Sequence, residues 1–358
     1  MNGLVLLCRA GFEGDCAAEI QEKAAALGVY GYCQTQADQA YVVYHCQAEE
    51  ADHLAKKLPL KELIFTRTFF VLLTSAQLAG IEDRVSVVKE ALEPHKEWFG
   101  LAGALRVETP DSNEANAIAK FCRKFAVPLR QGLRAADLLS KKPLAKRPFL
   151  HVFFVNKAYA LLGYSYSFNQ SPFEEGILRL RMPSNGPSRS TLKLDEAFHV
   201  FIPEDEREQR IQAGMRAVDL GAAPGGWTYQ LVRRGMMVQA VDNGPMADSL
   251  METGQVDHIR EDGFKYRPKR RNVTWLVCDM VEKPARVGEL MTAWLLEEYC
   301  KEAIFNLKLP MRQRYASVKQ YLDQITEQLQ EQGERSFEIQ AKHLYHDREE
   351  ITVHLRWL

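Results

Sequence analysis

Residues 217–227 constrain the fold of this chain more than any other stretch. They read A-V-D-L-G-A-A-P-G-G-W, a short apolar run that breaks into a turn of small residues, and a helical pattern begins at Trp227. Strand, glycine turn and helix in this order open a doubly wound α/β domain. Because the turn carries no bulky side chain, a ligand can approach its backbone and the first amides of the helix. The stretch therefore predicts a ligand-binding α/β domain.

Length and composition describe an ordinary soluble globular protein. The chain has 358 residues, of which 46% are hydrophobic and 26% charged, so two domains are expected. The net charge of −1 means that any basic surface must be local. Seven scattered cysteines, with no C-x-x-C, argue against a disulfide framework or a metal site and for a reducing compartment. We find no secretory leader and no membrane-length apolar stretch, and expect a cytoplasmic protein with no membrane partner.

Short strands and helices alternate through the first half of the chain. In residues 1–75 the patterns predict strands at 4–8, 41–45 and 64–73 and helices at 12–27 and 49–57, which indicates an α+β, ferredoxin-like subdomain. In residues 76–170 they predict helices at 85–92, 114–125 and from Pro128 to about 139, and a strand at 103–108. A hairpin follows over 148–156 and 158–164, with Asn156-Lys157 at its turn.

Positive charge is concentrated between residues 120 and 147. Asp137 is the one acid there, and the nine basic residues are Lys120, Arg123, Lys124, Arg130, Arg134, Lys141, Lys142, Lys146 and Arg147. A solvated helix face is the plain alternative. In a near-neutral chain, however, such a concentration suits the phosphates of a nucleic acid. We therefore expect this segment to bind RNA.

The same region resembles the THUMP-containing RNA-modifying enzymes. The resemblance rests on R-V-E-T-P-D-S-N-E-A-N-A-I-A-K-F-C-R-K-F (residues 106–125), P-L-R-Q-G-L-R (residues 128–134) and the hairpin that follows. It implies that residues 76–170 form a THUMP-like domain that binds structured RNA. Residues 171–190 are rich in Pro, Gly, Ser and Asn and carry Arg179, Arg181 and Arg189, so we expect a basic linker there.

The second half, residues 191–358, alternates regularly after an opening helix. Strands are predicted at 237–241, 258–260, 273–277 and 303–308, and helices at 228–233, 286–299 and 315–331. A hairpin over 337–343 and 351–357 closes the domain. Alternating βα units that end in an antiparallel hairpin are typical of a Rossmann-like class I methyltransferase domain.

Acidic residues fall where the predicted strands end, at the edge where such sheets bind ligands. Asp242 can accept both ribose hydroxyls of a nucleoside, and Asp262 can accept the exocyclic amine of an adenine. The NAD fingerprint G-x-G-x-x-G is absent, because Ala-Ala-Pro follows Gly221. The turn is more similar to that of S-adenosylmethionine enzymes. Ser190 is a candidate for the polar end of the cofactor's methionine tail, and a solvated linker serine is the alternative.

Four further residues form a candidate catalytic set. Lys193, Asp279, Lys308 and Glu350 occur in the order Lys-Asp-Lys-Glu, at a helix start, two strand ends and a strand start. Methyl transfer to an alcohol needs a base for the hydroxyl proton, and a lysine serves when a neighbouring cation and partial burial lower its pKa. We predict Lys308 as the base and Lys193 as the second cation, balanced by the two acids. Glu349 is adjacent to Glu350, so the sequence leaves the fourth member open, and surface salt bridges are the alternative.

This set, together with D-L-G-A-A-P-G-G-W, resembles the RNA 2′-O-ribose methyltransferases that use a Lys-Asp-Lys-Glu tetrad. With the THUMP-like first half, the resemblance covers nearly the whole chain and is greatest to enzymes that modify bacterial 23S ribosomal RNA. It implies S-adenosyl-L-methionine as cofactor and 2′-O-methylation of a cytidine in the peptidyl-transferase region. We expect a monomeric enzyme whose partner is 23S ribosomal RNA, either naked or in a pre-ribosomal particle. The cofactor contacts that it implies are Ala223, Pro224, Gly225, Gly226, Asp242, Asp262 and Asp279.

Two other functions stay open on the same fold. An RNA base methyltransferase acting on amino groups normally carries [DN]-P-P-[YF] after the fourth strand, where this chain has Asp279-Met280-Val281-Glu282. A C5-methylating enzyme needs a nucleophilic cysteine, commonly after proline, but no Pro-Cys occurs, and we expect Cys278 to be a buried strand residue. The third possibility is a non-catalytic RNA-binding assembly factor, against which the complete tetrad argues.

Overall fold

A computed structural model describes residues 2–113, 115–331 and 335–358. The chain divides into two compact units, one up to Ile177 and the other from Leu178 onward. This division falls inside the segment 171–190 that we expected to link two domains. Each unit contains its own sheet, and the candidate site lies entirely in the second.

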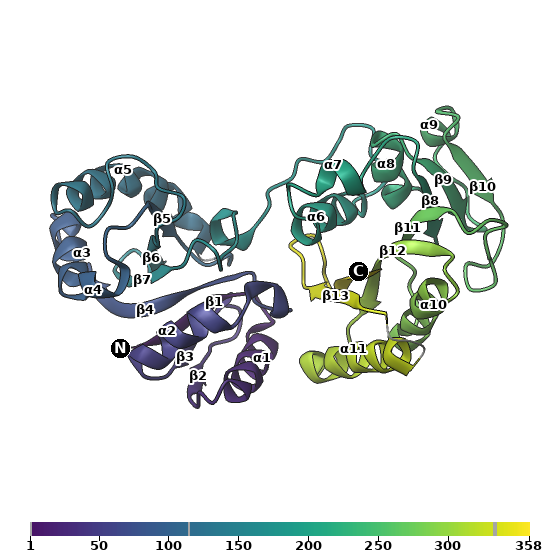
Figure 1. Cartoon of the computed structure of the whole chain (residues 1–358). Helices are drawn as coiled ribbons and strands as arrows, with labels where there is room; N and C mark the ends of the chain where they lie inside the picture. The colour runs from purple at the N-terminus through teal and green to yellow at the C-terminus, as the bar shows by residue number, and fades with distance from the viewer. Residues whose placement is uncertain (1, 114, 332–334) are drawn as a thin grey trace. The chain divides into compact units, whose positions relative to one another are not determined.

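The first unit is an α/β layer whose elements are shown in purple to teal in Figure 1. Its strands are β1 (Gly3–Leu7), β2 (Tyr32–Gln34), β3 (Tyr41–His45), β4 (Thr68–Gln77), β5 (Ala104–Glu108), β6 (Phe149–Asn156) and β7 (Tyr159–Ser165). Its α-helices are α1 (Glu13–Ala26), α2 (Ala48–Lys57), α3 (Arg84–Leu92), α4 (Lys96–Phe99) and α5 (Ala119–Ala135).

One sheet runs through this whole unit, in the order β2-β3-β1-β4-β7-β6-β5. The first four strands and two helices follow the β-α-β-β-α-β order of a ferredoxin-like fold, which confirms the predicted fold class. The boundary that we expected at 75/76 falls within β4, which pairs with β1 on one side and β7 on the other. The two expected subdomains therefore share a continuous sheet, because a single long strand serves both.

The two helices predicted on either side of Pro128 are one helix, α5, with the proline inside it. Cys122, Phe125, Leu129 and Leu133 are buried at intervals of three and four residues, so one apolar stripe packs along the entire helix. Pro128 is exposed, and this packing offsets the backbone hydrogen bond that the proline cannot donate. Glu114, where we expected the first helix to begin, lies outside the described residues.

The second unit has the architecture predicted for a class I methyltransferase. Its strands are β8 (Arg216–Leu220), β9 (Met237–Val241), β10 (Val256–Ile259), β11 (Val273–Cys278), β12 (Cys300–Lys308), β13 (Phe337–Lys342) and β14 (Glu350–Trp357). Its helices are α6 (Thr191–Phe201), α7 (Arg207–Arg210), α8 (Gly226–Arg233), α9 (Asp248–Met251), α10 (Pro284–Leu296) and α11 (Arg314–Glu331).

The sheet of this unit has the order β10-β9-β8-β11-β12-β14-β13. Strands β8 to β12 run parallel to one another, and β14 enters antiparallel between β12 and β13. Helices α6 and α8 lie on one side of the sheet and α10 and α11 on the other (Figure 1). Because both faces are covered, β8 and β11 are almost entirely buried. Of the helices in the described ranges, none has the length and apolar character needed to cross a membrane.

Candidate active site

The glycines of the turn between β8 and α8 have close neighbours that leave no room for a side chain. Gly221 and Gly225 have φ angles of +73° and +114°, which favour glycine. A Cβ atom at Gly226 would lie 2.2 Å from the Ser190 hydroxyl oxygen and 2.4 Å from that of Ser188. The two serine hydroxyls are themselves 2.7 Å apart. The structure thus brings Ser190, predicted as a cofactor contact, against the glycine turn.

The predicted cofactor aspartates follow neighbouring parallel strands. Asp242 follows β9, and its two carboxylate oxygens accept hydrogen bonds from the backbone amides of Ala223 (3.0 Å) and Gly244 (2.7 Å). Asp262 lies beyond the end of β10 and is exposed, with Oδ1 accepting from the Phe264 amide at 2.9 Å. Asp242 is therefore fixed to the turn at Ala223, whereas Asp262 keeps a more open carboxylate.

These features fit S-adenosyl-L-methionine. The turn carries only small side chains and leaves the first amides of α8 open to the methionine part, and Asp242 lies at the strand end where we predicted that a ribose binds. Gly244 lies close to this carboxylate, since a Cβ there would come within 3.2 Å of Asp242 Oδ1. Ser190, Ala223 to Gly226, Asp242, Asp262 and Asp279 remain the residues that we predict to hold the cofactor.

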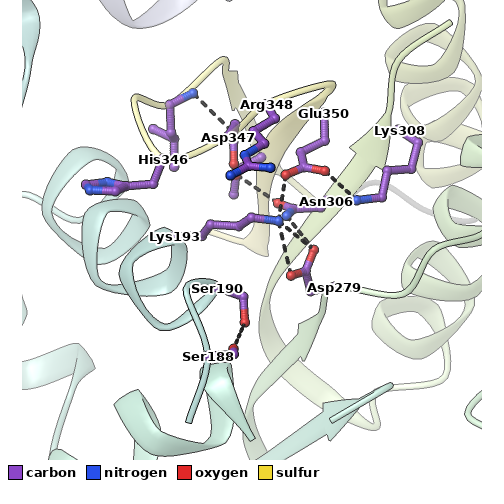
Figure 2. Close-up of polar contacts among 12 residues, drawn as sticks. Ser188, Ser190, Lys193, Asp279, Asn306, Lys308, His346, Asp347, Arg348 and Glu350 are labelled. Atoms are coloured by element: carbon purple, nitrogen blue, oxygen red, sulfur yellow. Dashed lines mark hydrogen bonds and ion pairs between the residues drawn. The ribbon is translucent and has the colours of Figure 1, made fainter. Parts of the chain in front are cut away.

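The four residues of the predicted tetrad form one connected cluster (Figure 2). The Lys193 amine, from α6, lies 3.2 Å from both carboxylate oxygens of Asp279 and 2.6 Å from Glu350 Oε1. The other oxygen of Glu350 is ion-paired with Lys308. One carboxylate therefore bridges the two lysines, and a second holds Lys193 from the end of β11.

Glu350, rather than Glu349, makes these contacts. Glu350 opens β14 directly opposite Lys308 of β12, and its side chain is 7% exposed. The Glu349 side chain is 65% exposed and lies 3.3 Å from Arg314. The choice that the sequence left open follows from the strand register, because β14 begins at Glu350 with Lys308 as its register partner, whereas Glu349 precedes the strand.

The charges of the cluster keep Glu350 and Lys193 ionised. Burial raises the pKa of Glu350, but its contacts with Lys193 and Lys308 outweigh this, and the pKa lies below its ordinary value. Burial likewise lowers the pKa of Lys193, but the charges of Asp279 and Glu350 more than offset the effect, and the pKa is raised. Lys193 is thus a fixed cation.

The sequence did not predict a buried chain of hydrogen bonds behind the tetrad. The side-chain amide of Asn306, on β12, donates to Asp279 Oδ1 at 2.7 Å, and its oxygen accepts from the Thr352 hydroxyl at 2.8 Å. Asn306 and Thr352 are register partners, two residues from the Lys308–Glu350 pair. The Thr352 hydroxyl also lies 2.9 Å from Asp347, a buried carboxyl whose pKa is raised well above the usual range by burial. Strand alternation in I-F-N-L-K, which puts Asn306 on the same face as Lys308, was the available signal.

A cavity of about 540 Å³ opens beside the cluster. Lys193, Lys308 and Glu350 line it together with Arg189, Ser190, His346, Arg348 and Glu349. The two arginines and His346 were not among the predicted site residues, although Arg189 was noted in the linker. The cavity therefore joins the predicted tetrad to a basic wall.

Other chemistry finds little support around this site. Cys278 is buried, as expected, and burial raises the pKa of its thiol to about 12, which does not suit a nucleophile at neutral pH. Within the described ranges, no group of three or more His, Cys, Asp or Glu side chains is arranged to hold a metal ion.

Family models match most of the chain in three parts. Residues 1–70 match the RlmM ferredoxin-like domain, residues 83–166 match the N-terminal region of ribosomal RNA large subunit methyltransferase M, and residues 187–333 match FtsJ-like methyltransferase. The resemblance of residues 76–170 to THUMP domains stays a prediction.

Curated relatives match over their full length. The ribosomal RNA large subunit methyltransferase M of Idiomarina loihiensis is 76% identical over 100% of this chain and 97% of its own. Proteins of the same name from Pseudoalteromonas translucida and Proteus mirabilis are each 56% identical over 99% of this chain and 97% of theirs. Among solved structures, TrmN from Thermus thermophilus aligns over 100% of both chains at 14% identity, with a TM-score of 0.35 that supports no further argument.

Proposed function

The chain belongs to the ribosomal RNA large subunit methyltransferase M family, and on that premise we propose that Lys193, Asp279, Lys308 and Glu350 catalyse 2′-O-methylation of a ribose in 23S ribosomal RNA. By the family resemblance the target is a cytidine of the peptidyl-transferase region. The enzyme depends on S-adenosyl-L-methionine, which supplies an electrophilic methyl group when bound. We also propose that it acts as a monomer in the cytoplasm, where ribosomal RNA is made.

Lys308 is the general base in this proposal. Its amine, once it has released its proton, accepts the proton of the 2′-hydroxyl while that oxygen becomes methylated. Lys193 is held ionised by Asp279 and Glu350, and it stabilises the negative charge that grows on the ribose oxygen. Glu350 orients both amines from one carboxylate. The two lysines therefore have different roles: Lys308 accepts a proton, and Lys193 stabilises negative charge.

The observation that carries the proposal is the bridge through Glu350. Two lysines from different elements, α6 and β12, share one mostly buried carboxylate at the edge of the sheet where ligands bind. A surface salt bridge would not need a buried acid or a second lysine. The bridge also argues against a non-catalytic assembly factor, because RNA binding alone does not require two lysines paired through a buried acid near the glycine turn.

The basic segment 120–147 is proposed to bind the RNA. It comprises α5 and the loop before β6, and none of its nine basic side chains forms an ion pair with a residue that the structure describes. Seven of them are exposed, while Arg130 and Arg134 are half-buried. Free cations on one helix and its following loop suit the phosphates of structured RNA.

The test compares wild type with Lys308→Ala. Ribose methylation is mapped on 23S ribosomal RNA from cells whose own gene is deleted and which express either the wild type or the variant. The methylation rate and RNA binding are measured with the purified proteins, and cofactor binding is measured by calorimetry. We expect the variant to lose about 10²- to 10⁴-fold in methylation rate and to bind cofactor and RNA normally. An unchanged rate would remove Lys308 from the mechanism, and methylation of a base rather than a ribose would refute the proposed reaction.

A further inference from the structure

Two arginines line the cavity beside the tetrad, while the acids that line it are paired elsewhere: Glu350 with the two lysines and Glu349 with Arg314. Lys193 and Lys308 are paired with Asp279 and Glu350. Arg189 and Arg348 line the same cavity, are exposed, and have no ion pair within the part of the chain that the structure describes. Two guanidinium groups at the site are therefore available to bind an anion.

Arg348 is carried by a loop that is held firmly in place. Glu196 of α6 accepts hydrogen bonds from the backbone amides of Tyr345 (2.8 Å) and His346 (2.9 Å), and from the His346 ring at 2.6 Å. Glu196 is buried, so these contacts are sheltered from water. A third anchor is the His343 ring, which donates to the Arg348 carbonyl at 2.9 Å. The β13–β14 loop thus fixes the backbone from which Arg348 reaches the cavity (Figure 2).

Arg189 stands on the other chain segment that borders the cavity. It precedes Ser190, whose hydroxyl lies against the glycine turn, and it comes two residues before the start of α6. Backbone hydrogen bonds from Thr191 to Ser188 and from Lys193 to Ser190 join the segment to the first turn of α6, and Ser188 and Ser190 lie against Gly226 of the glycine turn. Both arginines are therefore presented from anchored backbone, which lowers the entropy lost when they bind a ligand.

We propose that Arg189 and Arg348 bind the phosphodiester groups that flank the target ribose. This inference rests on the proposed function, because a 2′-hydroxyl at Lys308 brings the phosphates attached to the same sugar into the cavity. Guanidinium groups make paired hydrogen bonds with phosphate oxygens, which fixes orientation as well as charge. The two arginines then bind the RNA strand on both sides of the sugar and add affinity, while Lys308 and Lys193 act on its hydroxyl.

The test uses the full-length protein with Arg189→Ala, Arg348→Ala and the double variant. Affinity for transcribed 23S ribosomal RNA is measured across a salt series with S-adenosylhomocysteine present, and KM and kcat are measured with the same RNA. We expect each substitution to raise Kd and KM about tenfold, to leave kcat within about threefold, and to reduce the slope of log affinity against log salt by about 0.7–0.9. Arg348→Lys should recover the salt slope but only part of the affinity.

Arg335→Ala is the matched control, because this exposed arginine lies 3.3 Å from Glu298 and away from the cavity residues. It should behave as wild type. The inference is overturned if the cavity variants keep the wild-type Kd, KM and salt slope. It is also overturned if they lose cofactor affinity instead, since the guanidinium groups would then bind the carboxylate of the cofactor. A wild-type protein that binds RNA through these arginines without methylating ribose would refute the proposed function alone.

Discussion

Lys308 and Glu350 face each other as register partners on β12 and β14, and their side chains form an ion pair. The two residues are 42 positions apart in sequence and become neighbours because β14 lies between β12 and β13 in the sheet. The antiparallel end of the sheet, which distinguishes this domain from a wholly parallel one, therefore supplies one of the four candidate catalytic groups. Pairing across strands also explains why Glu350, rather than Glu349, contacts the two lysines.

Replacing Glu350 with Gln tests this relationship. The amide keeps the shape of the side chain but leaves Lys193 and Lys308 with Asp279 as the remaining acid of the cluster. We expect kcat to fall about 10²-fold, because charge balance and the orientation of Lys308 are both lost. The free energy of unfolding should fall by roughly 1–3 kcal/mol, since a mostly buried acceptor is weakened. Steady-state kinetics well below the melting temperature measure the effect.

The control for that variant is Glu349→Gln, which changes the neighbouring exposed acid. It should retain nearly wild-type kcat. If the two variants lose activity equally, the bridging carboxylate has no special part in the reaction.

A second prediction concerns the buried amide of Asn306, which is 1% exposed. Asn306→Ala removes the donor that fixes Asp279 and leaves the Thr352 hydroxyl with one partner fewer. We expect kcat to fall about tenfold with KM for RNA unchanged, and the free energy of unfolding to fall by about 1–3 kcal/mol. Kinetics and chemical denaturation check the two effects separately.

Thr352→Val separates positioning from stability. It removes the hydroxyl on the far side of Asn306 but leaves the Asn306–Asp279 contact in place. We expect Thr352→Val to lower the free energy of unfolding about as much as Asn306→Ala does, but to lower kcat less. Equal losses of kcat in both variants would mean that Asn306 acts only through stability.

The sequence predicted the second domain better than the first, for physical reasons. Its parallel strands are short apolar runs that end in acids or in the glycine turn, so both the strands and the ligand-binding edge are visible in the residues. Asn306 was missed because an amide in an apolar strand gives no sign of its partner, which comes from β11. In the first unit, β4 belongs to two expected subdomains, and no local pattern reveals pairing with both β1 and β7.

A third prediction concerns RNA binding by the basic segment. Arg134 is a poor position for this test, because it donates to the Ser140 carbonyl at 3.1 Å and so supports a loop. Arg123 and Lys124 on α5 are exposed. Replacing both with Gln should weaken RNA binding and reduce the salt slope by about 0.9 for each lost contact. Binding measured across a salt series checks it.

Lys57 and Lys61 provide the comparison for this pair. Both are exposed, belong to the same unit and lie outside the basic segment. Changing both to Gln should leave affinity and salt slope nearly as in wild type. Equal effects of the two double variants would mean that charge in general, rather than the segment 120–147, governs binding.

A fourth prediction concerns the glycine turn. Gly226→Ala places a methyl group within 2.4 Å of two serine oxygens, so the turn or the Ser188–Ser190 segment must move. Cofactor affinity, measured by calorimetry, should fall at least tenfold because the approach to the α8 amides is disturbed. Gly14→Ala is the control: its Cβ meets no atom within 4 Å in α1, so it should stabilise the protein by about 0.5–1 kcal/mol and leave cofactor binding unchanged.

The last prediction concerns pH and Asp219, a buried acid on β8. Burial is the main cause that raises the pKa of its carboxyl from 3.8 to about 7, and the charges of Asp279 and Asp242 raise it further while a hydrogen bond from Thr228 lowers it. The folded state holds this proton more tightly than the unfolded chain does. The contribution of Asp219 to the free energy of unfolding is therefore greatest below about pH 4. That contribution is lost as pH rises from about 4 to about 7, and it amounts to at most about 4 kcal/mol.

Asp219→Asn removes the ionisation but keeps an oxygen that accepts from the Thr228 hydroxyl. The variant should therefore gain stability over wild type between pH 5 and pH 8, with the difference largest at pH 8. Urea unfolding of both proteins at several pH values in this range measures it. Curves that stay parallel with pH would show that Asp219 does not hold a proton in the folded domain, and that its buried charge is instead compensated by the glycine turn and α8 that follow it.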